Sequence, residues 1–297
     1  MSYPDFLIVG APKCGTTAMW HYLRQHPQIV MPDFKEPHFF GSDLPIQRSI
    51  TSPDAYQALF QPASGQICGE SSTWYLYSQT AAREIQSINP HARIIAMLRN
   101  PIDFMYSLHN QALHEGVENI DDFAIALAAE PDRKVGKRLP PRYVPLQELL
   151  YSEVAHFSTQ VQRYLGVFGP EQVHLIIYDD FQRHTGRVFQ QTLAFLGVDD
   201  TFQTEFLIVN ASKQPRSKTM RSLITCPPAP VRTIARATMP QPFRQWLQAT
   251  MNRLNTRYQP RPPMDAELRR RLQQQFAPEV AQLGALLGRD LSHWSNA

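Results

Sequence analysis

A glycine-containing loop between an apolar run and a helix-length segment constrains the fold of this chain most. The stretch FLIVGAPKCGTTAMWHYL, residues 6–23, reads as a buried strand, a tight loop and a helix. Gly10 and Gly15 keep the spacing of a phosphate-binding loop, in which helix amides point at an anion. In an ATP-binding loop a lysine follows the second glycine, whereas here that position is Thr16 and the lysine is Lys13. The loop therefore predicts a bound phosphate group, with the positive charge displaced from its place in an ATPase.

Strand and helix patterns alternate along most of the chain. Apolar strands are predicted at residues 6–10, 66–70, 92–98 and 173–181. Helices are predicted at residues 16–26, 78–88, from 101 onward, 153–169, 186–198 and 266–288. This alternation predicts an α/β fold, with a parallel sheet covered by helices on both faces. No convincing domain boundary is visible, so residues 1–297 are expected to form a single domain.

Composition excludes several classes of protein. No window approaches the ~18 uninterrupted apolar residues of a membrane helix, and the N-terminal residues lack the basic region of a signal peptide. A cytoplasmic protein is therefore expected. The three cysteines are far apart, and the histidines show no metal-binding spacing, so the sequence predicts neither a disulfide framework nor a structural metal.

Positive charge is concentrated in one part of the chain. The net charge is only +3, but residues 206–264 contain ten Lys or Arg and no Asp or Glu. An anionic partner or a solvated basic face would equally explain this asymmetry. Nucleic acid is not expected, because no recognised nucleic-acid-binding motif accompanies the charge. A second basic, proline-containing stretch, residues 132–147, is predicted to be a loop or flap.

A second candidate motif follows the strand predicted at residues 92–98. In LRNPIDFMYSLHNQ, Arg99 stands at the carboxyl end of that strand, where ligands bind in open α/β sheets, and Ser107 lies about two turns into the next helix. An arginine fork and a serine hydroxyl can both contact an additional phosphate. Alone, an arginine in this place often just bridges to a carboxylate. Together with the loop around Lys13, the pair predicts a ligand with two separate anionic groups.

On these two motifs the chain resembles the sulfotransferases that use 3′-phosphoadenosine 5′-phosphosulfate (PAPS). PKCGTT is similar to the 5′-phosphosulfate loop of that family, and RNPIDFMYS is similar to its 3′-phosphate motif. The resemblance implies a P-loop-type α/β fold with a central parallel sheet, and a reaction that needs no metal. It implies that the 3′-phosphate is bound by Arg99 and Ser107, and that the 5′-phosphosulfate is bound by Lys13, Cys14, Gly15, Thr16 and Thr17. At Cys14 many members have Ser or Gly, and we expect the turn to tolerate this small residue.

Further segments extend the resemblance over nearly the whole chain. KEPHFF, residues 35–40, is similar to the segment that carries the catalytic glutamate in the heparan-type branch of the family. NASKQPRSK, residues 210–218, is similar to a basic loop that covers the cofactor in bacterial members. This likeness implies that the phosphates are also contacted by Arg216, Ser217 and Lys218. The final segment GRDLSHW, residues 288–294, also resembles the family.

Sulfuryl transfer requires a base for the acceptor proton and a cation at the oxygen that leaves. We expect Glu36 to be the base and Lys13 to be the cation, with His38 as a reserve base because histidine titrates near neutral pH. The plainer alternatives are an ion pair between Glu36 and Lys35 or a nearby arginine, and a structural, hydrogen-bonded His38. Glu70, which follows another strand, is expected to orient the lysine or the acceptor, or to form a buried ion pair.

The sequence therefore predicts an enzyme that moves a sulfuryl group from PAPS to a hydroxyl or amine of a carbohydrate or small-molecule acceptor. The product would be 3′-phosphoadenosine 5′-phosphate (PAP), and the basic stretch leaves open an anionic acceptor. One alternative is a P-loop nucleotide kinase or ATPase, against which the displaced Lys13 argues. Another is a non-catalytic module that binds an anionic glycan. The acceptor, the choice between O- and N-sulfation and the oligomeric state are not predicted.

Overall fold

The computed structural model describes residues 3–46, 48, 50–141, 144–206 and 262–295, together with a few positions between 207 and 261. By their contacts the residues group into two compact units. One unit contains Met1–Met105, Ser152–Val209 and Ala266–Ala297, and the other contains Tyr106–Tyr151 and Asn210–Asp265. The single domain over residues 1–297 stays a prediction.

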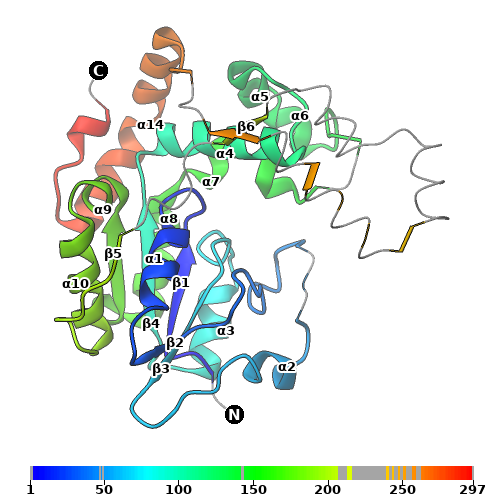
Figure 1. The fold of residues 1–297 in the computed structure, drawn as a ribbon. Helices are drawn as coiled ribbons and strands as arrows, with labels where there is room; N and C mark the ends of the chain where they lie inside the picture. Colours follow the sequence, from blue (N-terminus) through cyan, green and yellow to red (C-terminus); the bar gives the residue numbers. More distant parts are fainter. Residues whose placement is uncertain are drawn as a thin grey trace. The chain divides into compact units, whose positions relative to one another are not determined.

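A five-stranded sheet forms the centre of the first unit, and all its strands are parallel (Figure 1). In spatial order the strands are β2 (Ile29–Val30), β3 (Ile67–Ser71), β1 (Phe6–Gly10), β4 (Arg93–Leu98) and β5 (Val173–Ile177). In the central strand β1, Phe6, Leu7, Ile8 and Val9 are all 0% exposed. Successive side chains of a strand point to opposite faces, so both faces of the sheet are covered at β1. The predicted α/β fold with a central parallel sheet is confirmed.

Helices cover this sheet and also pack on one another. Helix α1 contacts β1, α10 contacts β5, and α8 contacts β4, β5, α3 and α14. The helical segments of this unit, including two that cross its boundary, are α1 (Thr16–Leu23), α2 (Pro53–Gln57), α3 (Ala81–Ile88), α4 (Pro101–Glu115), α7 (Tyr151–Val154), α8 (Phe157–Phe168), η2 (Pro170–Gln172), α9 (Tyr178–Arg183), α10 (Thr185–Leu196), α14 (Ala266–Leu287) and η3 (Ser292–Trp294).

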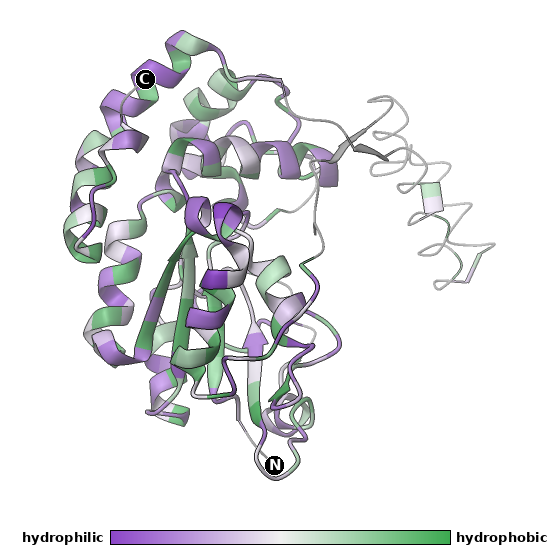
Figure 2. Ribbon diagram, turned by 60° about the vertical axis from the view of Figure 1, so that its left-hand side comes forward, coloured by the Kyte–Doolittle hydropathy of each residue, from purple (hydrophilic) through white to green (hydrophobic). Residues whose placement is uncertain are grey.

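Hydropathy follows this layered arrangement. The strands of the sheet are coloured mainly as hydrophobic in Figure 2, whereas the helices around them carry both hydrophobic and hydrophilic residues. A helix with one apolar face buries that face and leaves the other in water. In the part of the chain that the structure describes, no helix combines the length and the apolar character that crossing a membrane would require.

The predicted elements differ from the structure mainly at their ends. The strand predicted at residues 173–181 is too long, because β5 ends at Ile177 and Tyr178–Arg183 is helix α9. Asp179 and Asp180 lie in the first turn of α9, where negative charge interacts favourably with the helix dipole. The helix predicted at residues 153–169 is two helices, α7 and α8. Strand β2 and helix α2 were not predicted.

The second unit contains the later part of α4 and short helices around a buried charged pair. Its further elements are α5 (Phe123–Ala128), α6 (Glu130–Lys134), η1 (Leu146–Leu149), and the antiparallel strands β6 (Lys213–Pro215) and β7 (Thr256–Tyr258). The prediction of a loop over residues 132–147 is wrong for its first residues. Arg133 lies in α6, is 0% exposed and donates a hydrogen bond of 2.8 Å to Glu118, so this stretch is anchored in the protein interior.

Candidate active site

The loop between β1 and α1 ends in a glycine that no larger residue could replace without strain. Gly15 has a φ of 90°, in the left-handed region, and a Cβ added there would lie 3.0 Å from Phe181 and 3.2 Å from Tyr178. Gly15 is also the N-cap of α1, and no side chain caps this helix end. The first amides of an α-helix have no partner within the helix. The end of the loop therefore has the geometry of an anion-binding site.

The other predicted loop residues differ in how they lie. Thr16 is buried and Thr17 is half-buried, and both begin α1. Lys13 is half-buried, with a left-handed φ of 64°. Cys14 is fully buried, and burial raises the pKa of its thiol to about 12, although Arg99 and Lys13 act against the shift. The thiol is therefore neutral and unreactive near pH 7, and it adds no charge to the loop.

Arg99 of the second motif lies next to this loop. Its Nη1 donates a hydrogen bond of 3.5 Å to the backbone oxygen of Lys13, and its guanidinium lies over the ring of Tyr178, 4.6 Å from the ring centroid. A guanidinium over an aromatic face is stabilised and fixed in orientation. Sequence reasoning missed Tyr178, and the available signal was its position directly after a strand at the same sheet edge as Arg99. Ser107 is buried on α4, in the second unit.

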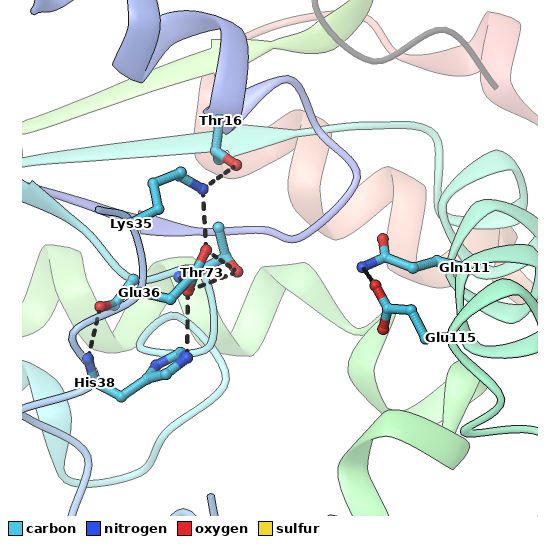
Figure 3. A network of polar contacts seen from close by, with 8 residues as sticks. Thr16, Lys35, Glu36, His38, Thr73, Gln111 and Glu115 are labelled. Atoms are coloured by element: carbon cyan, nitrogen blue, oxygen red, sulfur yellow. Dashed lines mark hydrogen bonds and ion pairs between the residues drawn. The ribbon is translucent and has the colours of Figure 1, made fainter. Parts of the chain in front are cut away.

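The KEPHFF segment supplies a carboxylate held by several donors (Figure 3). The Glu36 carboxylate accepts a hydrogen bond of 2.8 Å from the backbone amide of Thr73 and one of 3.1 Å from its hydroxyl. The ammonium of Lys35 lies 3.0 Å from Oε1 of Glu36 and 3.3 Å from Oγ1 of Thr16. The predicted alternative, an ion pair between Glu36 and Lys35, is therefore present. Because Thr16 begins α1, the Lys35 ammonium connects the Glu36 carboxylate to the end of the loop.

The backbone of this segment is unusual at two positions. Glu36 and His38 have φ values of 64° and 52°, which non-glycine residues seldom adopt. The backbone amide of Glu36 donates to Ser71 O at 2.9 Å, and that of His38 donates to Ser72 Oγ at 3.2 Å. Such conformations persist only when surrounding contacts hold them, and they concentrate at functional sites. The carboxyl end of β3 therefore fixes the direction in which the Glu36 carboxylate points.

His38 contacts the same carboxylate from another side. Its Nε2 lies 3.5 Å from Oε2 of Glu36, and its side chain is 15% exposed. Burial lowers the pKa of His38, and the charges of Lys35 and Arg48 lower it further, whereas Glu36 acts in the opposite direction. His38 is therefore neutral near pH 7, and its Nε2 is placed to donate to Glu36.

The comparisons with known proteins agree with this geometry. A family model described as "Sulfotransferase domain" matches residues 3–225, about three quarters of the chain. The chain belongs to the PAPS-dependent sulfotransferase family. A crystal structure of a sulfotransferase from Alicyclobacillus acidocaldarius is 31% identical, with a TM-score of 0.73 over 100% of both chains. The predicted family, enzyme class and P-loop-type fold are therefore confirmed.

Curated relatives of this sulfotransferase belong to the heparan-type branch. The human bifunctional heparan sulfate N-deacetylase/N-sulfotransferase 3 is 29% identical over 66% of this chain and 22% of its own length. The mouse heparan sulfate glucosamine 3-O-sulfotransferase 6 is 35% identical over 37% of this chain and 31% of its own length. The chain thus matches less than a third of the length of either relative. The likeness to this branch, predicted from KEPHFF, is confirmed.

Glu70 is close to the KEPHFF segment and has a different environment from Glu36. It is 1% exposed on β3, beside Tyr56, Tyr75 and Ser72. Burial raises the pKa of its carboxyl to about 8, the nearby charge of Glu36 adds to this shift, and the neighbouring tyrosine hydroxyls act against it. The predicted buried ion pair is not seen among the described residues, because no cation there pairs with Glu70. Glu70 is mainly a neutral carboxylic acid at pH 7.

Asp179 and Asp180, just after β5, are an acidic pair that a kinase-like site could use as metal carboxylates. Both residues have other partners. Asp179 accepts a hydrogen bond of 2.8 Å from Nε1 of Trp294, and Asp180 accepts one of 2.9 Å from Nη2 of Arg289. Asn100, which follows β4, donates a hydrogen bond of 3.4 Å to the backbone oxygen of Trp294. In the described part of the chain, no group of three or more His, Cys, Asp or Glu could hold a metal ion. The two aspartates therefore fasten the GRDLSHW segment to the sheet edge.

The basic loop at residues 210–218 lies largely outside the described residues. The three residues expected to close over the phosphates, Arg216, Ser217 and Lys218, lie outside the described residues. The same holds for most of the basic stretch between residues 206 and 264. Their roles stay predictions.

Proposed function

We propose that the chain transfers a sulfuryl group from PAPS to a hydroxyl or amine of a carbohydrate, or of a small molecule, and releases PAP. The observation that carries this proposal is the Glu36 carboxylate, which Thr73 holds in place while Lys35 links it to Thr16 at the end of the loop. A base lies beside an anion-binding helix end, and this is the pairing that in-line transfer from a phosphosulfate requires.

The donor would occupy the loop through its phosphosulfate. The amides at the start of α1 and the hydroxyls of Thr16 and Thr17 would donate to the phosphate and sulfonate oxygens. Lys13 would stabilise the bridging oxygen as negative charge develops on it. Arg99, fixed over Tyr178, would bind the 3′-phosphate. We retain the predicted contacts to the phosphates by Ser107 and by the loop residues Arg216, Ser217 and Lys218.

In the proposed step, Glu36 takes the proton of the acceptor while the acceptor oxygen or nitrogen bonds to sulfur. The bond between sulfur and the bridging oxygen breaks, its electrons stay on the bridging oxygen, and PAP leaves. His38 is neutral near pH 7 and lies 3.5 Å from the carboxylate, so we assign it the role of orienting Glu36 and keep it as the reserve base. No metal takes part in this scheme.

We propose a carbohydrate that contains an amino sugar as the acceptor. Support comes from the names of the two relatives, which act on heparan sulfate and its glucosamine, one at nitrogen and one at oxygen. The ten basic residues between positions 206 and 264 suit an anionic chain. We also retain a cytoplasmic location as part of the proposal.

Ligand binding tests the proposal against a kinase or ATPase. PAP should raise the melting temperature by several degrees at about 100 times its dissociation constant, whereas ATP with Mg²⁺ should not, because a ligand stabilises only the state that binds it. Lys13→Ala and Arg99→Ala should each reduce this shift, while the exposed Arg83→Ala on α3 should leave it unchanged. A shift with ATP and Mg²⁺ but none with PAP would refute the proposal.

The acceptor is tested by activity. Labelled sulfuryl donor should label a uronic acid–glucosamine polysaccharide, with free amines or with acetylated amines, more than a simple phenol or alcohol. Labelling of only the free-amine polymer would assign N-sulfation, and labelling of both would assign O-sulfation. Preference for the simple phenol would remove the carbohydrate from the proposal and leave sulfuryl transfer in place.

A further inference from the structure

The ammonium of Lys35 joins two parts of the site that have different tasks. It lies 3.3 Å from Oγ1 of Thr16, at the start of α1, and 3.0 Å from Oε1 of Glu36 (Figure 3). The side chain is only 14% exposed, so solvent screens these contacts less than those of a surface lysine. Lys35 therefore contacts both the end of the loop and the carboxylate that is proposed to act on the acceptor.

The Glu36 carboxylate is fully occupied in this arrangement. A carboxylate offers about four lone-pair positions. Four donor groups face it: the amide and the hydroxyl of Thr73, the ammonium of Lys35, and Nε2 of His38 at 3.5 Å. To take a proton from an acceptor, Glu36 must lose one of these contacts. In this arrangement, the lone pairs of the proposed base Glu36 are therefore taken up by the four donor groups.

Lys35 is the contact that a bound donor would remove. The Thr73 amide is part of the backbone and cannot move alone. The Lys35 ammonium ends a flexible four-carbon stem, and its second contact is the threonine beside which the donor sulfonate would lie. A sulfonate brings a full negative charge to that place, and the ammonium can follow it at little conformational cost because it has three donors.

We propose that Lys35 is a sulfonate-binding residue that exchanges its ion pair with Glu36 for one with the donor, so that donor binding frees the base. This inference rests on the proposed function. It gives Lys35 a task distinct from that of Lys13. Lys13 stabilises the oxygen that leaves with PAP, whereas Lys35 contacts the group that is transferred and is absent from PAP.

The experiment compares binding of the donor with binding of the product. Isothermal titration, without acceptor, measures the affinities of the wild-type chain and of Lys35→Met for PAPS and for PAP. The variant should bind PAPS about 10- to 100-fold more weakly, the effect of one charge-assisted hydrogen bond. Its affinity for PAP should stay within about twofold, because PAP carries no sulfonate. Lys137→Met, on an exposed lysine, is the matched control and should change neither affinity.

Turnover gives a second readout. Lys35→Met should raise the KM for PAPS and lower kcat, whereas Lys35→Arg should recover most of the preference for PAPS over PAP, because it restores the positive charge. Equal losses of PAPS and PAP affinity would assign Lys35 to the loop structure and overturn the inference, as would unchanged PAPS affinity. Failure of the wild-type chain to bind PAP would instead contradict the proposed function.

Discussion

Two networks of charged residues, one in each unit, differ in how completely they are shielded from water. In the second unit Glu118 and Arg133 are both 0% exposed, and Glu118 accepts hydrogen bonds from Arg133, from Tyr151 at 2.7 Å and from two backbone amides. In the first unit the Glu36 side chain is 30% exposed, and its donors include Lys35 and the longer contact to His38. Both carboxylates are surrounded by donors, but only Glu36 can be reached from solvent.

Backbone geometry separates the two networks further. Glu36 and His38 both have left-handed φ values, whereas Glu118 and Arg133 do not. A buried pair with ordinary backbone geometry stabilises the fold locally, and its loss leaves an uncompensated charge. A partly exposed pair on unusual backbone is held in that conformation by its surroundings, and the catalytic role proposed for Glu36 gives a reason for it. Mutations should therefore affect activity at one network and stability at the other.

The largest expected effect is at Glu36. Glu36→Gln removes the base and keeps the shape of the side chain, while its single acceptor oxygen keeps part of the hydrogen bonds, so kcat should fall about 10²- to 10⁴-fold. The melting temperature should change by no more than about 2 °C, because the residue is partly exposed. Initial rates with labelled PAPS and a thermal melt measure both quantities. If Glu36→Gln retains the full rate, the base lies elsewhere, and His38→Gln becomes the variant to compare.

The second effect is at the buried pair. Arg133→Met leaves the Glu118 carboxylate buried without its cation and should lower the free energy of unfolding by about 3–5 kcal/mol, measured by urea denaturation. The double variant Glu118→Gln with Arg133→Met should lose clearly less than the sum of the two single variants, because it leaves no charge inside. Additive losses would contradict the assignment of this network as a mutually dependent pair.

The smallest effect, counted per pH unit, concerns Glu70, a buried acid close to the Glu36 network. Its pKa is raised from 4.5 to about 8, so between these values the folded chain keeps a proton that the unfolded chain has released. Folding then takes up a proton, and the stability lost per pH unit as pH rises is at most about 1.4 kcal/mol. Glu70→Gln cannot titrate, so its stability should fall less between pH 5 and 8 than that of the wild type. Equal slopes in urea titrations at pH 5, 6.5 and 8 would show that Glu70 is ionised in the folded state.

Sequence reasoning identified the parts of this chain whose local pattern carries a physical meaning. The strand, loop and helix around Gly15, the parallel sheet and the family followed from spacing and from resemblance, and the structure and the comparisons confirm them. The contact between Lys35 and Thr16 could not be predicted, because it joins residues from separate segments whose distance depends on the fold. Tyr178 was assigned to a strand because its neighbours are apolar, whereas the two aspartates after it favour the start of a helix.

The fastening of Trp294 has a practical consequence for handling this protein. Its indole and backbone oxygen hold the residues that follow β4 and β5, next to Arg99 and Tyr178. A purification tag or fluorescent fusion joined just after this tryptophan would disturb these contacts at the carboxyl ends of β4 and β5. A tag placed before Phe6 avoids this, because β1 begins at the opposite end of the parallel strands, away from their carboxyl ends.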